Sequence, residues 1–427
     1  MSLVTPRKGY KSVPWLFGKE IEIPQEWEVK RLDEIGEIIG GGTPDSTNKD
    51  YWNGNILWAV PTDITKLQVN QIEDTERKIT KLGLENSSAK LLPNKTILIT
   101  SRATIGECAI TTKPITTNQG FQNIICYNNY HNYLIFYLIK QFPNNLLRLS
   151  QGTTFLEINK NQMKKIIIPI SNNIKEQQKI ATILSNVDNL IESTGKVITH
   201  SKKVKTGLMQ KLLTRGIGHT KFKKVPWLFG KEIEIPDEWE VKTISELGKI
   251  VTGSTPDTTN KKYFGNDFLW ASPIDFEGEK YITQTNSMLS EKGLSISRKI
   301  PKDAVLVVCI GSTIGKIGMA SVEMSTNQQI NSIICNNVDS NFIYYQLQQN
   351  NYLIKNRSNQ SAVPIINKTE FGKFKLILPN EIQKQQKIAT ILSNIDDKIT
   401  SQEQYKEKLE RLKKSLMQKL LTGEVRV

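Results

Sequence analysis

The chain has 427 residues, of which 38% are hydrophobic and 23% are charged, with a formal net charge of +15 and a pI near 9.4. This mixture excludes a disordered chain, and no apolar run reaches the roughly 18 residues of a membrane-spanning helix, so we expect a cytoplasmic protein with no membrane partner. The basic surplus favours a polyanion such as nucleic acid, while a solvated lysine-rich surface without a partner would give the same charge.

The sequence is duplicated. Residues 13–30 and 225–242 are identical at 17 of 18 positions, Gln25 against Asp237 being the exception, and matching stretches continue in order to 208–214 and 416–422. The period of about 210 residues is far longer than the roughly 20–50 residues of a solenoid repeat. The duplication predicts two similar domains, each followed by a connector, which can imitate a symmetric dimer and so match the approximate two-fold symmetry of DNA.

The globular part of each half is predicted to be α+β. A glycine-rich loop, at 40–44 and at 253–256, follows a proline-bounded entry. Short apolar runs typical of buried strands then occur at 96–100, 124–127, 304–310 and 332–335. The stretches 131–142 and 341–354 have the apolar spacing of helices.

Each half ends in a long predicted helix. From 173 to 216 and from 380 to 427, apolar residues alternate at spacings of three and four over about 40 residues. Such a stripe must be covered, so we predict that the two helices form an antiparallel intramolecular coiled coil with a pseudo-two-fold relation between the halves. Polar stripe positions such as Lys205 and Lys406 are expected to fix the register. The alternative is that each helix packs only on its own domain.

Neither half contains a convincing catalytic constellation. The segment 311–316 resembles a phosphate-binding loop, but it is one residue too short and lacks the Ser or Thr that must follow. The four cysteines form no CxxC pair and the three histidines lack ligand spacing, so we expect no metal site. A binding or scaffolding role is therefore favoured over catalysis.

Six motifs occur twice in one order. They are EIPxxW at 22–27 and 234–239, GGTP or GSTP at 41–44 and 253–256, LWA at 57–59 and 269–271, TIG at 104–106 and 313–315, QQKIATIL at 177–184 and 385–392, and LMQKLLT at 208–214 and 416–422. This ordered set resembles the specificity subunit of type I restriction–modification enzymes, and the resemblance covers nearly the whole chain.

The resemblance implies a fold and a division of tasks. Residues 1–172 and 217–379 would be target-recognition domains that each read one half of a bipartite, asymmetric double-stranded DNA site. The helices at 173–216 and 380–427 would form the spacer and dock two methyltransferase subunits, and restriction or translocase subunits would join them. S-adenosylmethionine, Mg²⁺ and ATP would bind to these partners, so this chain is expected to be non-catalytic and to hold no cofactor.

The duplication also distinguishes base readers from framework residues. If the half-sites differ, residues that read bases should lie where the two halves differ, and identical positions should serve the framework, phosphates or a shared partner. In the repeat register Arg102 faces Gly311, and Gln122 and Asn123 also face different residues. Arg can grip guanine, and Gln or Asn can grip adenine, through two hydrogen bonds.

Matched basic and amide residues suit phosphate contacts. These are Lys49 with Lys261, Arg148 with Arg357, and Gln151 with Gln360. The other candidate DNA-contacting residues are Thr43, Thr104, Gln119, Thr153, Thr154, Thr255, Ser312, Thr313, Gln328 and Asn331. The segment 152–158 aligns with 361–367, whose sequence differs, so this loop is expected to meet DNA differently in the two halves.

Two other functions stay open on the residues alone. One is a DNA-binding regulator with two like domains, which needs no partner subunit. The other is a structural protein whose coiled coil holds two ligand-binding domains, which would lack the salt-sensitive duplex binding of a DNA reader.

Overall fold

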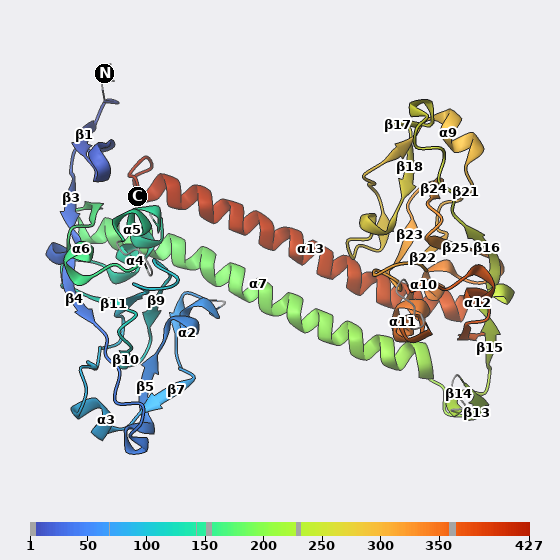
Figure 1. The fold of residues 1–427 in the computed structure, drawn as a ribbon, viewed down its shortest axis with the longest axis horizontal. Helices are drawn as coiled ribbons and strands as arrows, with labels where there is room; N and C mark the ends of the chain where they lie inside the picture. The colour runs from blue at the N-terminus through green and yellow to red at the C-terminus, as the bar shows by residue number, and fades with distance from the viewer. Residues whose placement is uncertain (1–5, 68, 142, 151–155, 228–231, 358–363) are drawn as a thin grey trace. The chain divides into compact units, whose positions relative to one another are not determined.

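The computed structural model describes residues 6–67, 69–141, 143–150, 156–227, 232–357 and 364–427. It divides into two compact units: unit 1 comprises Met1–Val197 with Gln402–Val427, and unit 2 comprises Ile198–Ser401. Each unit contains one globular domain and a part of both long helices, α7 (Ile174–Arg215) and α13 (Ile382–Leu420) (Figure 1).

Unit 1 is built around a five-stranded sheet. Its order is β4 (Gly36–Gly40), β11 (Gln122–Cys126), β8 (Ile97–Ile99), β9 (Cys108–Thr111) and β6 (Gln71–Ile72). Side chains of β8 alternate between two cores, with Ile97 and Ile99 in one and Leu98 in the other. A strand that is buried on both faces must be apolar at each position, which explains why the sequence reads as an unbroken apolar run.

A smaller sheet, two ribbons and short helices complete the domain of unit 1. The smaller sheet has the order β10 (Ile115–Thr117), β5 (Trp52–Ala59) and β7 (Arg77–Ile79). The ribbons pair β1 (Tyr10–Pro14) with β2 (Glu20–Pro24), and β3 (Trp27–Arg31) with β12 (Ile167–Ser171). The helices are α1 (Leu32–Ile35), α2 (Pro61–Thr65), α3 (Lys81–Glu85), α4 (Asn132–Gln141), α5 (Pro143–Leu149) and α6 (Lys160–Lys164).

Unit 2 repeats this plan. Its main sheet has the matching order β16 (Gly248–Thr252), β25 (Ile330–Cys335), β22 (Val305–Val308), β23 (Ile317–Ala320) and β19 (Tyr281–Ile282). The second sheet runs β17 (Phe264–Gly265), β20 (Met288–Leu289), β18 (Phe268–Ala271), β24 (Met324–Thr326) and β21 (Lys299–Ile300). The ribbons are β13 (Phe222–Pro226) with β14 (Glu232–Pro236), and β15 (Trp239–Thr243) with β26 (Lys375–Pro379). The helices are α8 (Ile244–Leu247), α9 (Glu291–Ile296), α10 (Ser340–Gln349), α11 (Asn351–Arg357) and α12 (Lys368–Gly372).

The two long helices pack antiparallel in each unit. In unit 1, Ile180 near the start of α7 shares a core with Leu420 at the end of α13. In unit 2, Leu212 near the end of α7 shares a core with Ile388 near the start of α13. The predicted fold class, α+β domains with an antiparallel intramolecular coiled coil, is confirmed, and packing of each helix on its own domain alone is excluded.

A glycine follows each long helix where the chain turns back onto a domain. Gly216 has φ +65° and donates its N–H to the Leu212 carbonyl at 3.2 Å, and Gly423 has φ +73° and donates to the Leu420 carbonyl at 3.3 Å. A Cβ on Gly216 would lie 2.9 Å from the Trp239 ring. The left-handed backbone and the close contact both require glycine.

Candidate nucleic-acid interface

Three loops meet at one place in each unit, and the identical residues of the repeat hold them together. The first loop carries the GGTP or GSTP motif. Its backbone is fixed by a tryptophan, because Trp58 Nε1 donates to the Gly42 carbonyl at 2.9 Å and Trp270 Nε1 donates to the Ser254 carbonyl at 3.0 Å. The LWA tryptophans therefore have a framework role.

The second loop follows β10 or β24 and lies against the first. Thr43 donates its hydroxyl to Gln119, and Thr255 donates to Gln328, with all four side chains exposed. A Cβ on Gly41 would lie only 1.9 Å from the Asn118 carbonyl oxygen, so the backbones touch. These exposed predicted residues thus form the same pair in both units.

The third loop carries the TIG motif. Ser101 N–H donates to the Gly120 carbonyl and Cys309 N–H donates to the Gln329 carbonyl, both at 2.8 Å, which joins the third loop to the second. Gly106 (φ +93°) and Gly315 (φ +87°) close the turn in a conformation that favours glycine. The predicted residues Thr104 and Ser312 are exposed in this turn, and Thr313 is half-buried.

The backbone hydrogen bonds correct the repeat register at this loop. Ser101 accepts from Ile158 N–H, and Cys309 accepts from Ile366 N–H. The next residues form isolated β-bridges, Arg102 with Glu157 in unit 1 and Ile310 with Ile365 in unit 2. Arg102 therefore corresponds to Ile310, and the predicted match with Gly311 is wrong. The turn that Gly315 N–H closes on the Val308 carbonyl is one residue longer than the turn that Gly106 N–H closes on the Thr100 carbonyl.

The alignment of the following loop also moves by one residue. Asn159 caps α6 by accepting the Gln162 N–H at 3.0 Å, and Asn367 caps α12 by accepting the Glu370 N–H at 2.8 Å. Asn367 therefore matches Asn159, whereas the alignment of 152–158 with 361–367 placed it one residue away. Glu157 and Ile365 are in turn equivalent.

Arg102 and Glu157 form an exposed ion pair beside these loops. Arg102 Nε lies 2.9 Å from Glu157 Oε1, and their side chains keep 45% and 35% of their exposure. Arg102 could be predicted from the sequence but Glu157 could not, because only the β-bridge brings this carboxylate, 55 residues further along the chain, beside Arg102.

Gln122, Asn123 and Asn331 are not available to contact bases. Asn123 is fully buried, and its amide donates to the Ile39 carbonyl at 3.1 Å and to Thr117 Oγ1 at 2.8 Å. Asn331 is 3% exposed and accepts the Thr252 hydroxyl at 2.6 Å. Gln122 is only 8% exposed. Their base-reading assignment is corrected: all three lie on the inner strands β11 and β25, where Asn123 holds the neighbouring β4 and Asn331 holds the neighbouring β16.

The structure describes the side chains of some of the residues that were predicted to contact phosphates. Lys49 and Lys261 are exposed on the 3-10 turns Lys49–Tyr51 and Lys261–Tyr263, and neither has an ion-pair partner among the described residues. Arg148 is exposed on α5, where its guanidinium lies 4.0 Å from the centre of the Phe17 ring. The side chains of Gln151, Thr153, Thr154, Arg357 and Gln360 lie outside the described residues.

The aspartates of the TPD motifs have a local role. Asp45 accepts the Thr47 N–H at 2.9 Å and Asp257 accepts the Thr259 N–H at 3.0 Å, and each also accepts the threonine hydroxyl at 2.8 Å. These hydrogen bonds lower the pKa of both carboxyl groups, which stay ionised at neutral pH. In the described part of the chain no group of three or more His, Cys, Asp or Glu residues is placed to hold a metal ion.

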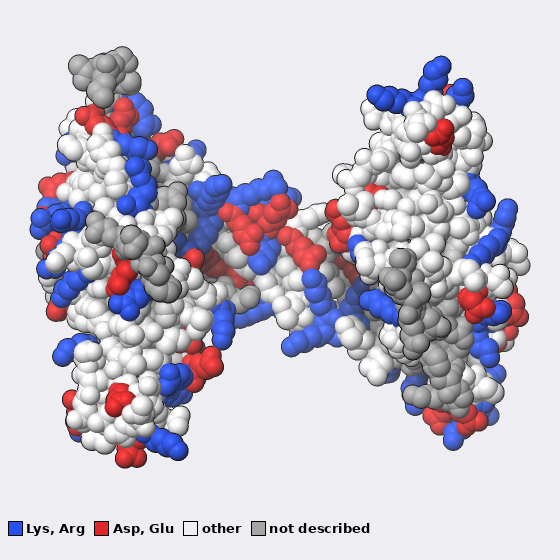
Figure 2. All heavy atoms as spheres, viewed as in Figure 1, with Lys and Arg blue, Asp and Glu red and all other residues white. Residues whose placement is uncertain are grey.

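Charge is spread rather than concentrated on the face in Figure 2, where basic and acidic side chains are interspersed over the described surface of each unit. The net charge of +15 attracts polyanions in general but does not by itself locate a site. The convergence of the three loops is the more specific signal. Within the described ranges, no helix is sufficiently long and apolar to cross a bilayer.

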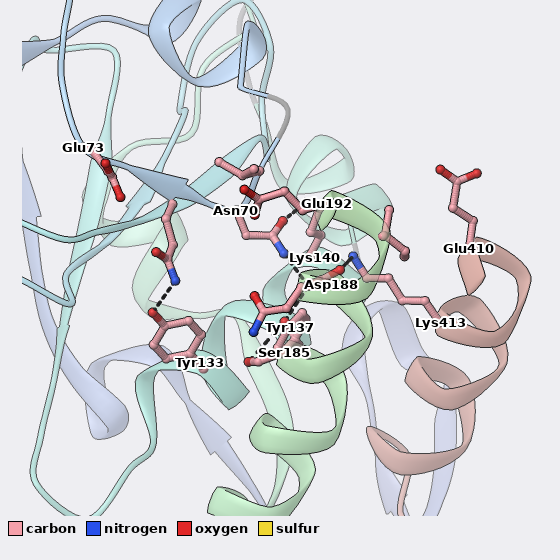
Figure 3. Close-up of a pocket in the computed structure, with 14 residues that line it drawn as sticks. Asn70, Glu73, Tyr133, Tyr137, Lys140, Ser185, Asp188, Glu192, Glu410 and Lys413 are labelled. Atoms are coloured by element: carbon pink, nitrogen blue, oxygen red, sulfur yellow. Dashed lines mark hydrogen bonds and ion pairs between the residues drawn. The ribbon is translucent and has the colours of Figure 1, made fainter. Parts of the chain in front are cut away.

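A second polar cluster joins the domain of unit 1 to its two helices (Figure 3). Asp188 of α7 lies 2.5 Å from Lys413 Nζ of α13 and accepts the Tyr137 hydroxyl of α4, beside a cavity of about 340 Å³. Burial, followed by the hydrogen bond and charge of Asp188, raises the pKa of the Tyr137 hydroxyl.

Unit 2 has an equivalent joint, in which α13 contributes the aspartate and α7 contributes the lysine. There Asp396 of α13 lies 2.5 Å from Lys205 of α7 and accepts the Tyr345 hydroxyl at 2.7 Å. The prediction that Lys205 lies at a register-fixing position of the coiled coil agrees with this pairing. Because each joint ties α7, α13 and a domain together, we assign it a structural role.

Both halves match known proteins. The family model described as type I restriction modification DNA specificity domain matches residues 24–200 and 236–411. The putative type I restriction enzyme MjaX specificity subunit of Methanocaldococcus jannaschii is 30% identical over 436 residues, covering 95% of each protein. The MjaIX specificity subunit of the same organism is 38% identical over 237 residues, which span 55% of this chain and 54% of that protein. The crystal structure of a type I restriction–modification S subunit from M. genitalium matches with a TM-score of 0.61 at 16% identity, covering 92% of this chain and 96% of that one.

Proposed function

This chain belongs to the family of type I restriction–modification DNA specificity proteins, and we propose that it recognises a bipartite, asymmetric DNA site to which it directs methyltransferase and restriction subunits. Its family membership implies sequence-specific DNA recognition. The two-part site and the targeting of partner subunits are our extension of that statement to this chain.

The observation that carries the proposal is a shared loop framework with different side chains. Both units hold the GGTP or GSTP loop with the same tryptophan contact and the same Thr–Gln pair. Yet the equivalent bridge residues are Arg102 and Glu157 in one unit and Ile310 and Ile365 in the other. Two frameworks that present different chemistry suit two half-sites of different sequence.

We assign distinct tasks to the exposed residues. Lys49 and Lys261, at matching positions and without ion-pair partners among the described residues, would contact phosphates and supply affinity that depends on salt. The exposed Arg102 would supply readout at base edges, where its planar guanidinium can donate two hydrogen bonds to guanine. Positioning and specificity would thus come from different residues.

Catalysis is assigned to partner subunits. The curated relatives are named specificity subunits, and we propose that this chain is likewise the non-catalytic member of its complex. Two methyltransferase subunits would bring S-adenosylmethionine, and restriction or translocase subunits would bring ATP and Mg²⁺. The helix ends at 177–184 and 385–392 are identical in sequence, which suits docking of the same partner twice.

Selection from a pool of random duplexes tests the DNA-reading function. The full-length chain is incubated with the pool at low salt, and the retained duplexes are sequenced. We expect two different conserved blocks separated by a gap of fixed length. Retention without any enriched sequence, or enrichment of a single block, would contradict the proposal.

A methylation assay tests the assignment of catalysis. The chain is incubated with the enriched duplex and labelled S-adenosylmethionine, with and without a type I methyltransferase subunit. Label should enter the DNA only when the methyltransferase subunit is present. Methyl transfer by this chain alone would refute the non-catalytic role.

A further inference from the structure

The equivalent β-bridges of the two units carry opposite chemistry at the surface. Arg102 and Glu157 are paired through their backbones in unit 1, as are Ile310 and Ile365 in unit 2. Both bridges follow the same hydrogen bond, donated by Ile158 N–H in one unit and by Ile366 N–H in the other. The backbone therefore presents the first position of each pair next to the TIG turn in the same way.

In unit 1 the bridge presents a donor and an acceptor together. The Arg102 guanidinium is held by Glu157 at 2.9 Å, yet both side chains stay partly exposed. An arginine can donate to guanine O6 and N7, and a glutamate can accept from cytosine N4 in the major groove. Because these edges belong to one base pair, an Arg–Glu pair is complementary to G·C. At an A·T pair the arginine would meet the N6 donor of adenine and the glutamate would meet the O4 acceptor of thymine.

In unit 2 the bridge presents hydrocarbon instead. Ile365 is 54% exposed, although its neighbour Ile366 is buried in the core. Isoleucine forms no hydrogen bond with a base edge, but its methyl groups can pack on the C5 methyl of thymine, which other bases of DNA lack. A single exposed isoleucine needs no explanation by itself. Ile365 is informative because its position is equivalent to that of Glu157 beside the TIG turn.

We infer that this bridge is a specificity-determining position in both units: Arg102 and Glu157 read a G·C pair in one half-site, and Ile365 reads a thymine methyl in the other. The inference rests on the proposed DNA-reading function and deepens it by naming the bases. Glu157 both orients the Arg102 guanidinium and accepts from cytosine, and Ile310, which is half-buried, is the backbone partner of Ile365.

Random-duplex selection is repeated with four variants of the full-length chain. Arg102→Ala and Glu157→Gln should each relax the preference at one G·C position of one block, with about a tenfold loss for Arg102→Ala on the wild-type site. Ile365→Ala should relax a thymine position in the other block. Ile296→Ala, which changes an equally exposed isoleucine on α9 at 54%, serves as the control and should change neither block.

A thymine-to-uracil exchange gives a second readout that does not depend on folding of a variant. Removing the methyl group at the assigned position should weaken binding of the wild-type chain about threefold to fivefold, as expected for one buried methyl group. The same exchange should have no effect on the Ile365→Ala chain.

The outcomes distinguish a failure of this inference from a failure of the proposed DNA-reading function. If no sequence is enriched with the wild-type chain, the DNA-reading function itself fails. If two blocks are enriched but Arg102→Ala and Ile365→Ala leave both unchanged, the inference is wrong and the function stands. A loss for Arg102→Ala that is equal on all sequences would make Arg102 a phosphate contact and would also overturn the inference.

Discussion

The last residues of the chain anchor unit 1 through an ion pair that can be tested by mutation and by pH. Arg426 Nε lies 2.5 Å from Glu176 Oε1, and Arg426 Nη1 lies 2.8 Å from Glu26. Glu176 is 4% exposed and also accepts from Ser171 Oγ at 2.5 Å and from Trp27 Nε1 at 3.3 Å. Burial works to raise the pKa of Glu176, but these hydrogen bonds outweigh it and lower the pKa.

We predict that Arg426→Met destabilises unit 1 by about 2 kcal/mol at pH 7. Removing one partner of a fully buried pair costs roughly 3–5 kcal/mol, and the value is reduced here because the Arg426 side chain is 42% exposed. The double variant Arg426→Met with Glu176→Gln should recover part of the loss, since it leaves no unpaired buried charge.

The loss should depend on pH with a definite sign. In the native chain the folded pKa of Glu176 lies below its unfolded value, so the stabilisation is present above about pH 4.3 and is lost as pH falls through the folded pKa. Protonation removes the charge that Arg426 compensates, so the difference between native chain and Arg426→Met should shrink below about pH 4.

Hydrogen exchange of backbone amides can measure this loss of stability and its dependence on pH, because it reports on each unit separately. Peptides around Trp27 and Glu176 should lose protection in Arg426→Met, while peptides of unit 2 act as an internal reference. Unit 2 has Lys384 at the position of Glu176, in an exposed pair with Glu238, so Lys384→Met is the matched control and should cost under about 0.5 kcal/mol. A loss in unit 1 that is under about 0.5 kcal/mol, or that does not change with pH, would refute the reasoning.

Four further predictions concern other residues. Asp188→Asn should destabilise unit 1 by about 2 kcal/mol in urea denaturation, because Lys413 is left half-buried and unpaired; a change within about 0.5 kcal/mol would contradict the joint. Lys49→Ala should reduce the slope of log K against log salt for duplex binding by about 0.9 if its ammonium meets a phosphate, and an unchanged slope removes it from the contacts. Gly41→Ala should abolish duplex binding because its Cβ would lie 1.9 Å from a carbonyl oxygen, whereas Gly207→Ala, with open space on α7, should stabilise the chain by about 0.5–1 kcal/mol in thermal denaturation.

The sequence predicted well those elements whose signal is local. The spacing of apolar residues predicted α7 and α13, because the residues on one buried face of a helix recur every three or four positions. The apolar run of β8 was visible because both of its faces are buried. The pairing of the helices followed from the need to cover each stripe with the other, and their antiparallel course followed from the pseudo-two-fold relation expected between the halves.

Contacts between distant segments were beyond the same reasoning. Asn123 looked like a surface amide because polar residues are mostly exposed, but β11 is an inner strand, and the Ile39 carbonyl and Thr117 satisfy the amide. The equivalence of Arg102 and Ile310 in the repeat was missed because a constant difference in residue number between the two halves cannot detect one extra residue in a loop. Backbone hydrogen bonds detect it directly.

Positions that match and positions that differ between the two copies are held by different kinds of contact. At Gly41 and its counterpart Gly253, a Cβ would approach carbonyl oxygens to 1.9 and 2.1 Å, so neither copy can vary there without rebuilding the loop. The bridge at Arg102 and at Ile310 is held by backbone atoms, which do not depend on the kind of side chain at these positions. One copy can therefore exchange an ion pair for hydrocarbon and keep its fold. The proposed reading of two different half-sites needs this separation, because the residues that read bases can then differ while both domains retain one framework.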